Sequence, residues 1–218
     1  MNRGQNCPGK IILVLILLCF NVNYSRAQAF RAELFAGVAG TQVSGDNLSG
    51  FNRAGGFVGA GIRTSLNNAL SIGFRGGLFQ KGSQSRVKSD GPDSAYYRLR
   101  INYLEFPLSL RYTLRPALYV ELGPSIGVYL NSREEDANGV LPETRSFYRY
   151  DLSAVGILGY VLGKKTDLQF GYWQSLTPIR PHQSGAVFRL NRGQYSSSIT
   201  FSLLYTLSAG AKKTNTIE

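Results

Sequence analysis

The feature that most constrains this chain is an alternation of apolar and polar residues with a period of two. From position 118 to 130 the even positions are Leu118, Val120, Leu122, Pro124, Ile126, Val128 and Leu130. The odd positions are Tyr119, Glu121, Gly123, Ser125, Gly127 and Tyr129. Segments 104–112 and 199–207 repeat the pattern. A helix would scatter these apolar residues around its circumference, so the pattern predicts β-strands with one apolar and one polar face.

Eight such segments are predicted, at 31–42, 55–66, 69–80, 98–114, 118–131, 148–162, 167–177 and 196–208. Long polar connections at 43–54, 81–97, 132–147 and 178–195 alternate with short ones at 67–68, 115–117 and 163–166. Outer-membrane barrels have short periplasmic turns, longer outside loops and an even strand number. We therefore predict an all-β fold, an eight-stranded antiparallel up-and-down transmembrane β-barrel, with both termini in the periplasm.

The two faces decide between a soluble and a membrane barrel. A soluble barrel points its apolar face inward, whereas a lipid-embedded barrel points that face outward. The polar face is rich in glycine, which suits a crowded interior, and lysines occur mostly at ends, turns and tails. Tyrosines near strand ends fit an interfacial girdle: Tyr112, Tyr129, Tyr148, Tyr150, Tyr160 and Tyr172. These observations favour the membrane barrel.

The N-terminal residues predict export. Arg3 and Lys10 precede a ten-residue apolar run at 11–20, and small residues follow. This order is typical of a secretory signal peptide, because the run is too short to span a bilayer as a helix. We expect residues 1–27 to be removed by cleavage after Ala27, with cleavage after Ala29 as the alternative. A lipoprotein cleaved before Cys19 is less favoured, because Leu18 is bulky for such a site.

Cleavage after Ala27 removes three basic residues, so the net charge falls from +11 to +8 over the remaining 191 residues. It also removes both cysteines, Cys7 and Cys19, and leaves a chain without disulfides. The expected barrel domain then covers 28–209, followed by a polar tail at 210–218. A closed barrel makes every backbone hydrogen bond within the sheet, which supplies stability that disulfides would otherwise give.

Charged residues on the polar face are predicted to fill the lumen. They are Glu33, Arg63, Arg75, Glu105, Arg111, Glu121 and Asp151. If residues 115–117 form a turn with Leu114 opposite Leu118, Arg111 lies opposite Glu121 and Tyr103 opposite Tyr129. Buried charges are expected to pair, because a lone one is costly. The favoured interpretation is a structural plug, since eight strands leave room for little more than side chains; the alternative is a proton or ion path.

Basic residues also occur in and beside the long connections: Arg86, Lys88, Arg98, Arg100, Arg180, Arg189 and Arg192. They are candidates for contacts with the phosphates of lipopolysaccharide or with envelope protein partners. A generic solvated rim is an equally good interpretation. No sequence motif of nucleic-acid-binding proteins occurs, so nucleic acid is not an expected partner despite the basic composition.

Catalysis is not predicted. The single histidine, His182, stands two residues before Ser184 in a long connection, which is no nucleophile–base arrangement. The acidic run Glu134-Glu135-Asp136 lacks the spacing of a known calcium loop and is interpreted as a solvated loop tip. We therefore expect no catalytic, cofactor-binding or metal-binding residues.

Two adjacent segments carry a family resemblance. Residues 103–112, YLEFPLSLRY, resemble the signature strand of PorT-like outer-membrane β-barrel proteins, and residues 118–125, LYVELGPS, resemble the strand that follows it. The glycine-rich stretch 55–61 fits as well, and the likeness runs from about 30 to 208. It implies an outer-membrane eight-stranded barrel of the OmpX/OmpA-like type. One departure is the C-terminal tail, which does not end on the aromatic residue found in many outer-membrane barrels.

Two functional interpretations follow. The first is a structural or surface-interaction barrel whose four outer loops contact lipopolysaccharide or partners, with a plugged lumen and no catalysis. The second, implied by the resemblance, is an accessory component of a protein-secretion machinery. A narrow channel is a third and less favoured interpretation.

Overall fold

The structure, a computed structural model, describes residues 30–46, 48, 50–85, 96–142, 145–182 and 193–207. The predicted signal peptide and the tail at 210–218 lie outside the described residues. Nine strands are found in the described part: β1 (Arg31–Ser44), β2 (Arg53–Ser65), β3 (Leu70–Gln84), β4 (Tyr97–Arg115), β5 (Leu118–Asp136), β6 (Gly139–Val140), β7 (Tyr150–Val161), β8 (Thr166–Ser175) and β9 (Tyr195–Leu207).

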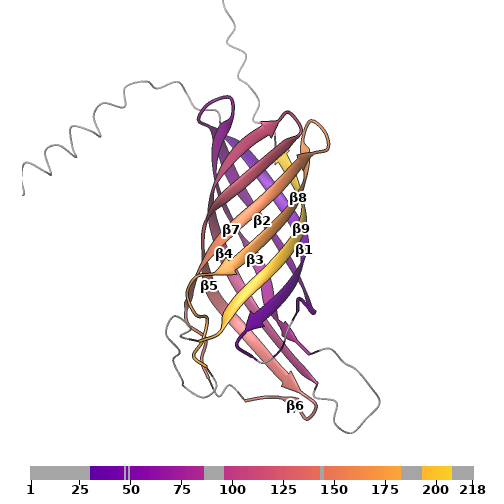
Figure 1. Ribbon diagram of the computed structural model, residues 1–218, viewed down its shortest axis with the longest axis vertical. Helices are drawn as coiled ribbons and strands as arrows, with labels where there is room; N and C mark the ends of the chain where they lie inside the picture. The colour runs from indigo at the N-terminus through magenta and orange to yellow at the C-terminus, as the bar shows by residue number, and fades with distance from the viewer. Residues whose placement is uncertain are drawn as a thin grey trace, which may run out of the picture.

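All the strands except β6 close into one antiparallel barrel (Figure 1). Each strand pairs with its neighbour in the chain, β1 pairs with β9, and the β4–β5 pairing completes the ring. The short turns and both ends of the described barrel lie at the upper end in Figure 1, which we call the short-turn end. The opposite end, which carries β6, is the long-loop end. The predicted eight-stranded up-and-down barrel is confirmed.

The predicted register across β4 and β5 is confirmed in the membrane part and wrong at the turn. Arg111 lies opposite Glu121 and Tyr103 lies opposite Tyr129. At the turn, however, Arg115 faces Leu118, because a bulge between Thr113 and Arg115 absorbs one residue. The expected Leu114–Leu118 pair therefore does not form.

The same two strands extend further than predicted. Pairing of β4 with β5 continues to Tyr97 opposite Asp136, past a second bulge beside Asn102. β6 then turns back onto the end of β5. Part of the expected loop at 132–147 is therefore a strand extension, and the acidic run lies on it rather than at a solvated loop tip.

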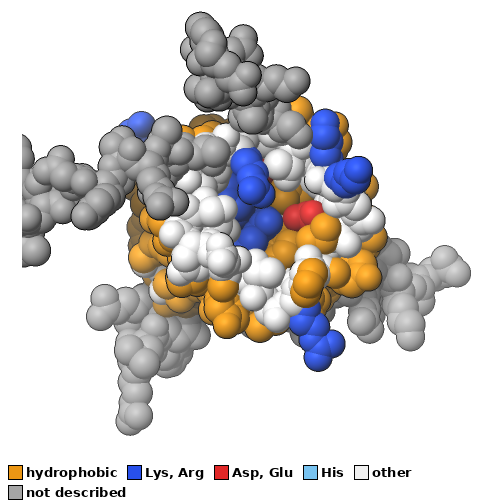
Figure 2. Space-filling view, turned by 90° about the horizontal axis from the view of Figure 1, so that it is seen from above, with side chains coloured by type: hydrophobic (Ala, Val, Ile, Leu, Met, Phe, Trp, Pro, Cys, Tyr) orange, Lys and Arg blue, Asp and Glu red, His pale blue; other side chains and the backbone are white. Residues whose placement is uncertain are grey.

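The apolar face points outward, as predicted. On β5, Leu122 is 66% exposed while its neighbour Glu121 is 1% exposed. Seen from the short-turn end, hydrophobic side chains surround the wall and basic side chains gather in its mouth (Figure 2). The predicted tyrosines are exposed except Tyr129, which packs against the ring of Tyr103 and is not part of a girdle. None of the described residues forms a helix long and apolar enough to cross a membrane.

Glycines on the inner face make room for bulky side chains of the lumen. A Cβ atom on Gly59 would lie 2.5 Å from the Phe35 ring, and one on Gly77 would lie 2.9 Å from it. A Cβ on Gly159 would lie 2.0 Å from the Tyr119 ring. The glycine-rich polar face is thus a requirement of a filled interior.

Candidate functional site

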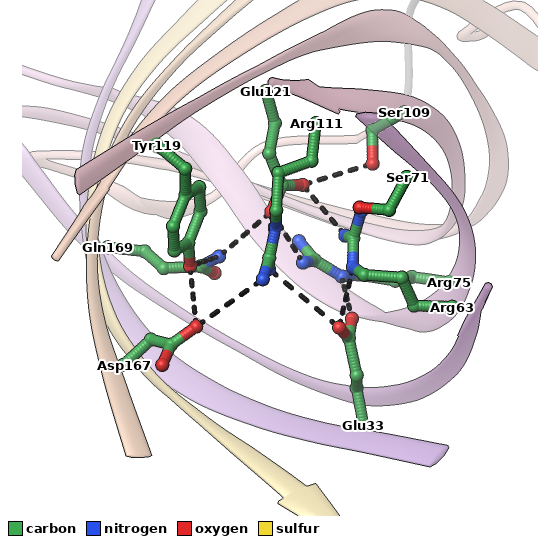
Figure 3. A network of polar contacts seen from close by, with 10 residues as sticks. All are labelled: Glu33, Arg63, Ser71, Arg75, Ser109, Arg111, Tyr119, Glu121, Asp167 and Gln169. Carbon is green, nitrogen blue, oxygen red and sulfur yellow. Dashed lines mark hydrogen bonds and ion pairs between the residues drawn. The ribbon is translucent and has the colours of Figure 1, made fainter. Parts of the chain in front are cut away.

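The short-turn half of the lumen is filled by a network of alternating charges (Figure 3). The Glu33 carboxylate accepts from Nε of Arg63 at 2.6 Å and from Nε of Arg75 at 3.1 Å. Glu121 contacts Nη2 of the same two arginines, both at 3.1 Å, and Nη2 of Arg111 at 2.6 Å. Two carboxylates from β1 and β5 therefore bind three guanidinium groups from β2, β3 and β4.

A third carboxylate, Asp167 of β8, was not among the predicted lumen residues. Its Oδ2 lies 3.5 Å from Nη1 of Arg111 and accepts a hydrogen bond from the Tyr119 hydroxyl at 2.9 Å. The Arg111 guanidinium also stacks 3.7 Å from the centre of the Tyr119 ring. Asp167 and Gln169 both lie at odd positions of β8, whose side chains point into the lumen. The alternation along this strand could therefore have identified Asp167 as a lumen residue. With Asp167, three carboxylates balance the three guanidinium charges, and none of these buried charges is left unpaired.

The remaining predicted carboxylates, Glu105 and Asp151, belong to a separate cluster nearer the long-loop end. Lys81 lies between them, with Nζ 2.6 Å from Glu105 Oε1 and 3.1 Å from Asp151 Oδ2. Ser125 donates to Glu105 at 2.6 Å and Ser153 to Asp151 at 3.2 Å. Lys81 was predicted to lie in the long connection 81–97. That placement is wrong, because β3 runs on to Gln84 and Lys81 is only 1% exposed.

Aromatic side chains separate the two charge clusters. The ring centroid of Phe79 lies 5.2 Å from that of Phe57 and 5.3 Å from that of Trp173, and Phe35 lies 5.9 Å from Phe57. A cavity of about 20 Å³ is left beside them, room for about one water molecule. This aromatic layer was not predicted, although each of its members lies at an inward position of the alternating pattern.

Residues of two long connections close the other end of the lumen. The apolar cluster at this end comprises Phe147 and Ile179 of these connections, Val43 of β1, and Leu99, Ile101 and Tyr103 of β4. Tyr148 donates its backbone N–H to the carbonyl of Ile179 at 2.8 Å, and Ile179 donates to that of Gln194 at 2.7 Å. The segment before β7 and the segment after β8 are thereby connected at the long-loop end of the lumen. We call these two segments, together with the apolar cluster, the cap.

Arg180 holds this cap together. Its guanidinium lies 4.7 Å from the centre of the Phe147 ring and binds Glu134 Oε2 at 2.9 Å. The Tyr97 hydroxyl donates to the other oxygen of Glu134 at 2.5 Å. Burial acts to raise the pKa of Glu134, but the hydrogen bonds from Arg180 and Tyr97 outweigh it and lower that pKa. Arg180 is 1% exposed, so the prediction that it contacts surface ligands is wrong.

Arg98 and Arg100 do lie on the outside. The residues that alternate with them, Leu99 and Ile101, are fully buried in the lumen, which places both arginines on the outer face of β4. Arg133 of β5 is the cross-strand neighbour of Arg100 on that face. The other predicted surface contacts lie outside the described residues: Arg86, Lys88, Arg189 and Arg192.

The candidate catalytic and metal residues do not form a site in the described part of the chain. Glu134 points into the cap while Glu135 pairs with Arg133 at 2.5 Å, so the acidic run divides between opposite faces. Across the described ranges, no three His, Cys, Asp or Glu side chains are grouped to hold a metal ion. His182 lies against Gly45 at the long-loop end, and Ser184 lies outside the described residues.

Comparison with known proteins decides the family. The model of the outer membrane protein beta-barrel domain family matches residues 22–180. The chain belongs to this family. It is therefore an integral protein of the bacterial outer membrane. No curated protein matches the sequence, and the PorT-like subfamily stays a prediction.

Solved barrels are similar in fold at low sequence identity. Ail, the attachment invasion locus protein of Yersinia pestis, solved with the heparin analogue sucrose octasulfate, is 12% identical, with 82% of this chain and 99% of that chain covered and a TM-score of 0.47. Neisserial surface protein A is 14% identical (82% and 97% covered, TM-score 0.45). OprG of Pseudomonas aeruginosa is 12% identical (84% and 98% covered, TM-score 0.44).

Proposed function

We propose that the protein is a closed structural barrel that acts through surfaces at its long-loop end and neither conducts ions nor catalyses a reaction. The observation that carries the proposal is the filling of the lumen at successive levels. The arginine–glutamate network, the aromatic layer, the Lys81 cluster and the apolar cap follow one another along the axis. Such an interior supports a closed lumen, since eight strands leave room for little more than side chains.

Ion conductance in planar bilayers tests this closed lumen. We expect the folded full-length protein to give no stepwise current under conditions in which a reference porin conducts. Stable single-channel steps from the wild-type barrel would establish the channel interpretation instead.

The proposal includes an orientation, with the short-turn end in the periplasm. The only cysteines, Cys7 and Cys19, lie in the predicted signal peptide, so single introduced cysteines report position cleanly. We expect a membrane-impermeant maleimide to label Asn138→Cys, in the β5–β6 turn, on intact cells. Asn68→Cys, in the exposed β2–β3 turn, should be labelled only after lysis. The reverse labelling pattern would show that the short-turn end faces the outside of the cell.

Export by a cleaved signal peptide is part of the same proposal. Mass spectrometry of the protein from outer-membrane fractions distinguishes cleavage after Ala27 from cleavage after Ala29. A lipid-modified N-terminus at Cys19 would support the lipoprotein alternative.

A role as accessory component of a protein-secretion machinery is the second candidate, supported by the resemblance of 103–112 and 118–125 to PorT-like proteins. Extraction in mild detergent separates the candidates. A barrel that purifies alone supports the structural role, whereas a defined complex supports the secretion role. For catalysis, a lipid-modifying activity that is lost in His182→Ala would contradict the proposal.

A further inference from the structure

Three amide side chains mark one edge of the apolar belt on the outer wall. Gln80 of β3 donates to Asn102 of β4 at 3.2 Å, and Asn102 donates to Asn131 of β5 at 2.6 Å. The neighbouring outer residues toward the short-turn end are leucines: Leu78, Leu104 and Leu130. The amides therefore lie where hydrocarbon gives way to lipid headgroups.

Three arginines lie on the same wall just beyond these amides, and we call Arg98, Arg100 and Arg133 the outer arginine patch. Toward the long-loop end, Arg100 is the next outward residue after Asn102 on β4, and Arg133 is the next outward residue after Asn131 on β5. Arg100 and Arg133 are directly opposite in the register, an arrangement that is unfavourable for like charges unless an anion neutralises them.

The patch has too few negative partners. Glu135 pairs with Arg133 and is the only described carboxylate within ion-pair distance of the patch. Nε of Arg98 is shielded from solvent and has no hydrogen-bond partner among the described residues. Among the described residues, Arg98 and Arg100 therefore form no ion pair, although Glu135 lies opposite Arg98 in the register.

A fourth arginine lies beside the patch. Arg53 of β2 is 2% exposed, and its guanidinium donates to Gln80 at 3.1 Å and forms no ion pair with a described carboxylate. Burial, and after it the positive charges of Arg98 and Arg100, lower the pKa of Arg53 to about 10. The charge of Glu135 acts in the opposite direction but does not outweigh them, so positive charge predominates among the described residues of this part of the wall.

Among the described residues, the outer arginine patch lies on one side of the barrel, on β4 and β5. On the other side, outward positions of β1 and β8 beyond the apolar belt carry the neutral amides Gln42 and Gln174, and no arginine follows either within its strand. A general attraction to an anionic membrane would not require such a one-sided arrangement.

We propose that the outer arginine patch binds the phosphate groups of an anionic lipid in the leaflet around the long-loop end, the chemistry that lipid A presents. Guanidinium groups bind phosphate through paired, charge-assisted hydrogen bonds. The sheet fixes these groups at headgroup level, immediately beyond the leucines that contact the acyl chains. The choice of lipid A rests on the proposed orientation; the phosphate site itself does not.

Native mass spectrometry of the full chain in detergent tests the site, with diphosphorylated and monophosphorylated lipid A as probes. The test variant combines Arg98→Gln, Arg100→Gln and Arg133→Gln. The control combines Arg31→Gln, Arg115→Gln and Arg149→Gln, exposed arginines elsewhere on the barrel, and changes the net charge equally. Each arginine near a membrane surface contributes about fivefold in binding, so the test variant should bind about a hundredfold more weakly.

Several outcomes support or overturn the proposal. Wild type and control should retain the diphosphorylated lipid more strongly than the monophosphorylated one, and Glu135→Gln should bind about fivefold more tightly. Equal binding by the test variant, or an equal loss in the control, would overturn the site.

Displacement by inorganic phosphate as effectively as by lipid would show a free-anion site instead. Heat-dependent migration on SDS gels verifies folding, and conductance and cysteine labelling test the proposed function separately.

Discussion

Two sets of arginines on neighbouring strands of this barrel differ in how their charges are neutralised. Inside the lumen, Arg63, Arg75 and Arg111 face the three carboxylates of Glu33, Glu121 and Asp167. On the outer wall, the outer arginine patch has Glu135 as its one described ion-pair partner. The inner set is neutralised within the protein, whereas the outer set needs charge from elsewhere.

Parity along β4 produces this difference. Arg111 is at an odd position and points into the lumen, whereas Arg98 and Arg100 are at even positions and point outward. A buried charge without a partner is strongly destabilising, but a charge at the edge of a membrane can be solvated or bound by a headgroup. One strand thus supplies both a stabilising arginine and binding arginines. The inner set is disrupted by removing one of its carboxylates.

Glu121→Leu should give the largest loss of stability. It leaves three buried guanidinium groups with two carboxylates, and we expect a cost of about 4 kcal/mol in the free energy of unfolding. Trp173, the single tryptophan, is 6% exposed in the lumen, so its emission during urea unfolding in lipid vesicles measures the change.

Arg111→Leu provides the matched partner for a double-mutant cycle. It is expected to destabilise as well, whereas the double variant retains Arg63 and Arg75 with Glu33 and Asp167 and should recover much of the loss. Additive effects of the two single substitutions would disprove that these charges form one coupled network.

Lys81→Met should have the next largest effect. It leaves Glu105 and Asp151 buried without their shared cation, at a cost of about 3 kcal/mol. A triple variant with Glu105→Gln and Asp151→Asn is the control, since it removes all three charges at nearly constant volume. If Lys81→Met alone unfolds at the same urea concentration as the wild type, the second cluster contributes no stability.

The cap should be sensitive to acid to a smaller degree. Because the folded-state pKa of Glu134 is lowered, its contribution is present above the ordinary value of 4.5 and is lost as the pH falls through the lowered value. We expect about 1–2 kcal/mol of local protection. Hydrogen exchange of 145–149 and 179–182 at neutral and acidic pH, corrected for intrinsic rates, measures it.

Glu134→Gln separates this effect from general acid damage. The variant should show reduced protection of the cap at neutral pH and little further change in acid. Protection that falls in acid to the same extent in both proteins would assign the effect to other groups.

Much of the barrel could be predicted from the sequence because the membrane enforces the alternation. In the belt, Leu122 must contact lipid and Glu121 must not, so their order in the chain reveals the face of each. The Arg111–Glu121 register was predicted from a three-residue turn; the turn is one residue shorter, and the bulge between Thr113 and Arg115 compensates for the difference and gives the predicted register.

Beyond the apolar belt the alternation of apolar and polar residues becomes weaker, because both faces of a strand tolerate polar residues there. This explains why Lys81 was assigned to a loop and why the strand extension at 132–136 was missed. The burial of Arg180 was equally hidden, since it depends on Glu134, Tyr97 and Phe147, which come from distant parts of the chain. Alternation gives the face of a residue but not its partners across the lumen.

The smallest effect on stability is expected for the outer arginine patch, and this sharpens the comparison most. Replacing Arg98, Arg100 and Arg133 by Gln in detergent without added lipid should change the free energy of unfolding by no more than about 0.5 kcal/mol, because the groups are near the surface and repel one another. With lipid A present, the wild type should gain stability that the variant does not, since a ligand of the folded state stabilises it. High salt should reduce that gain, because screening weakens exposed charges more than buried ones. Equal lipid-dependent stabilisation of both proteins would mean that the outer arginines, like the inner ones, serve the fold alone.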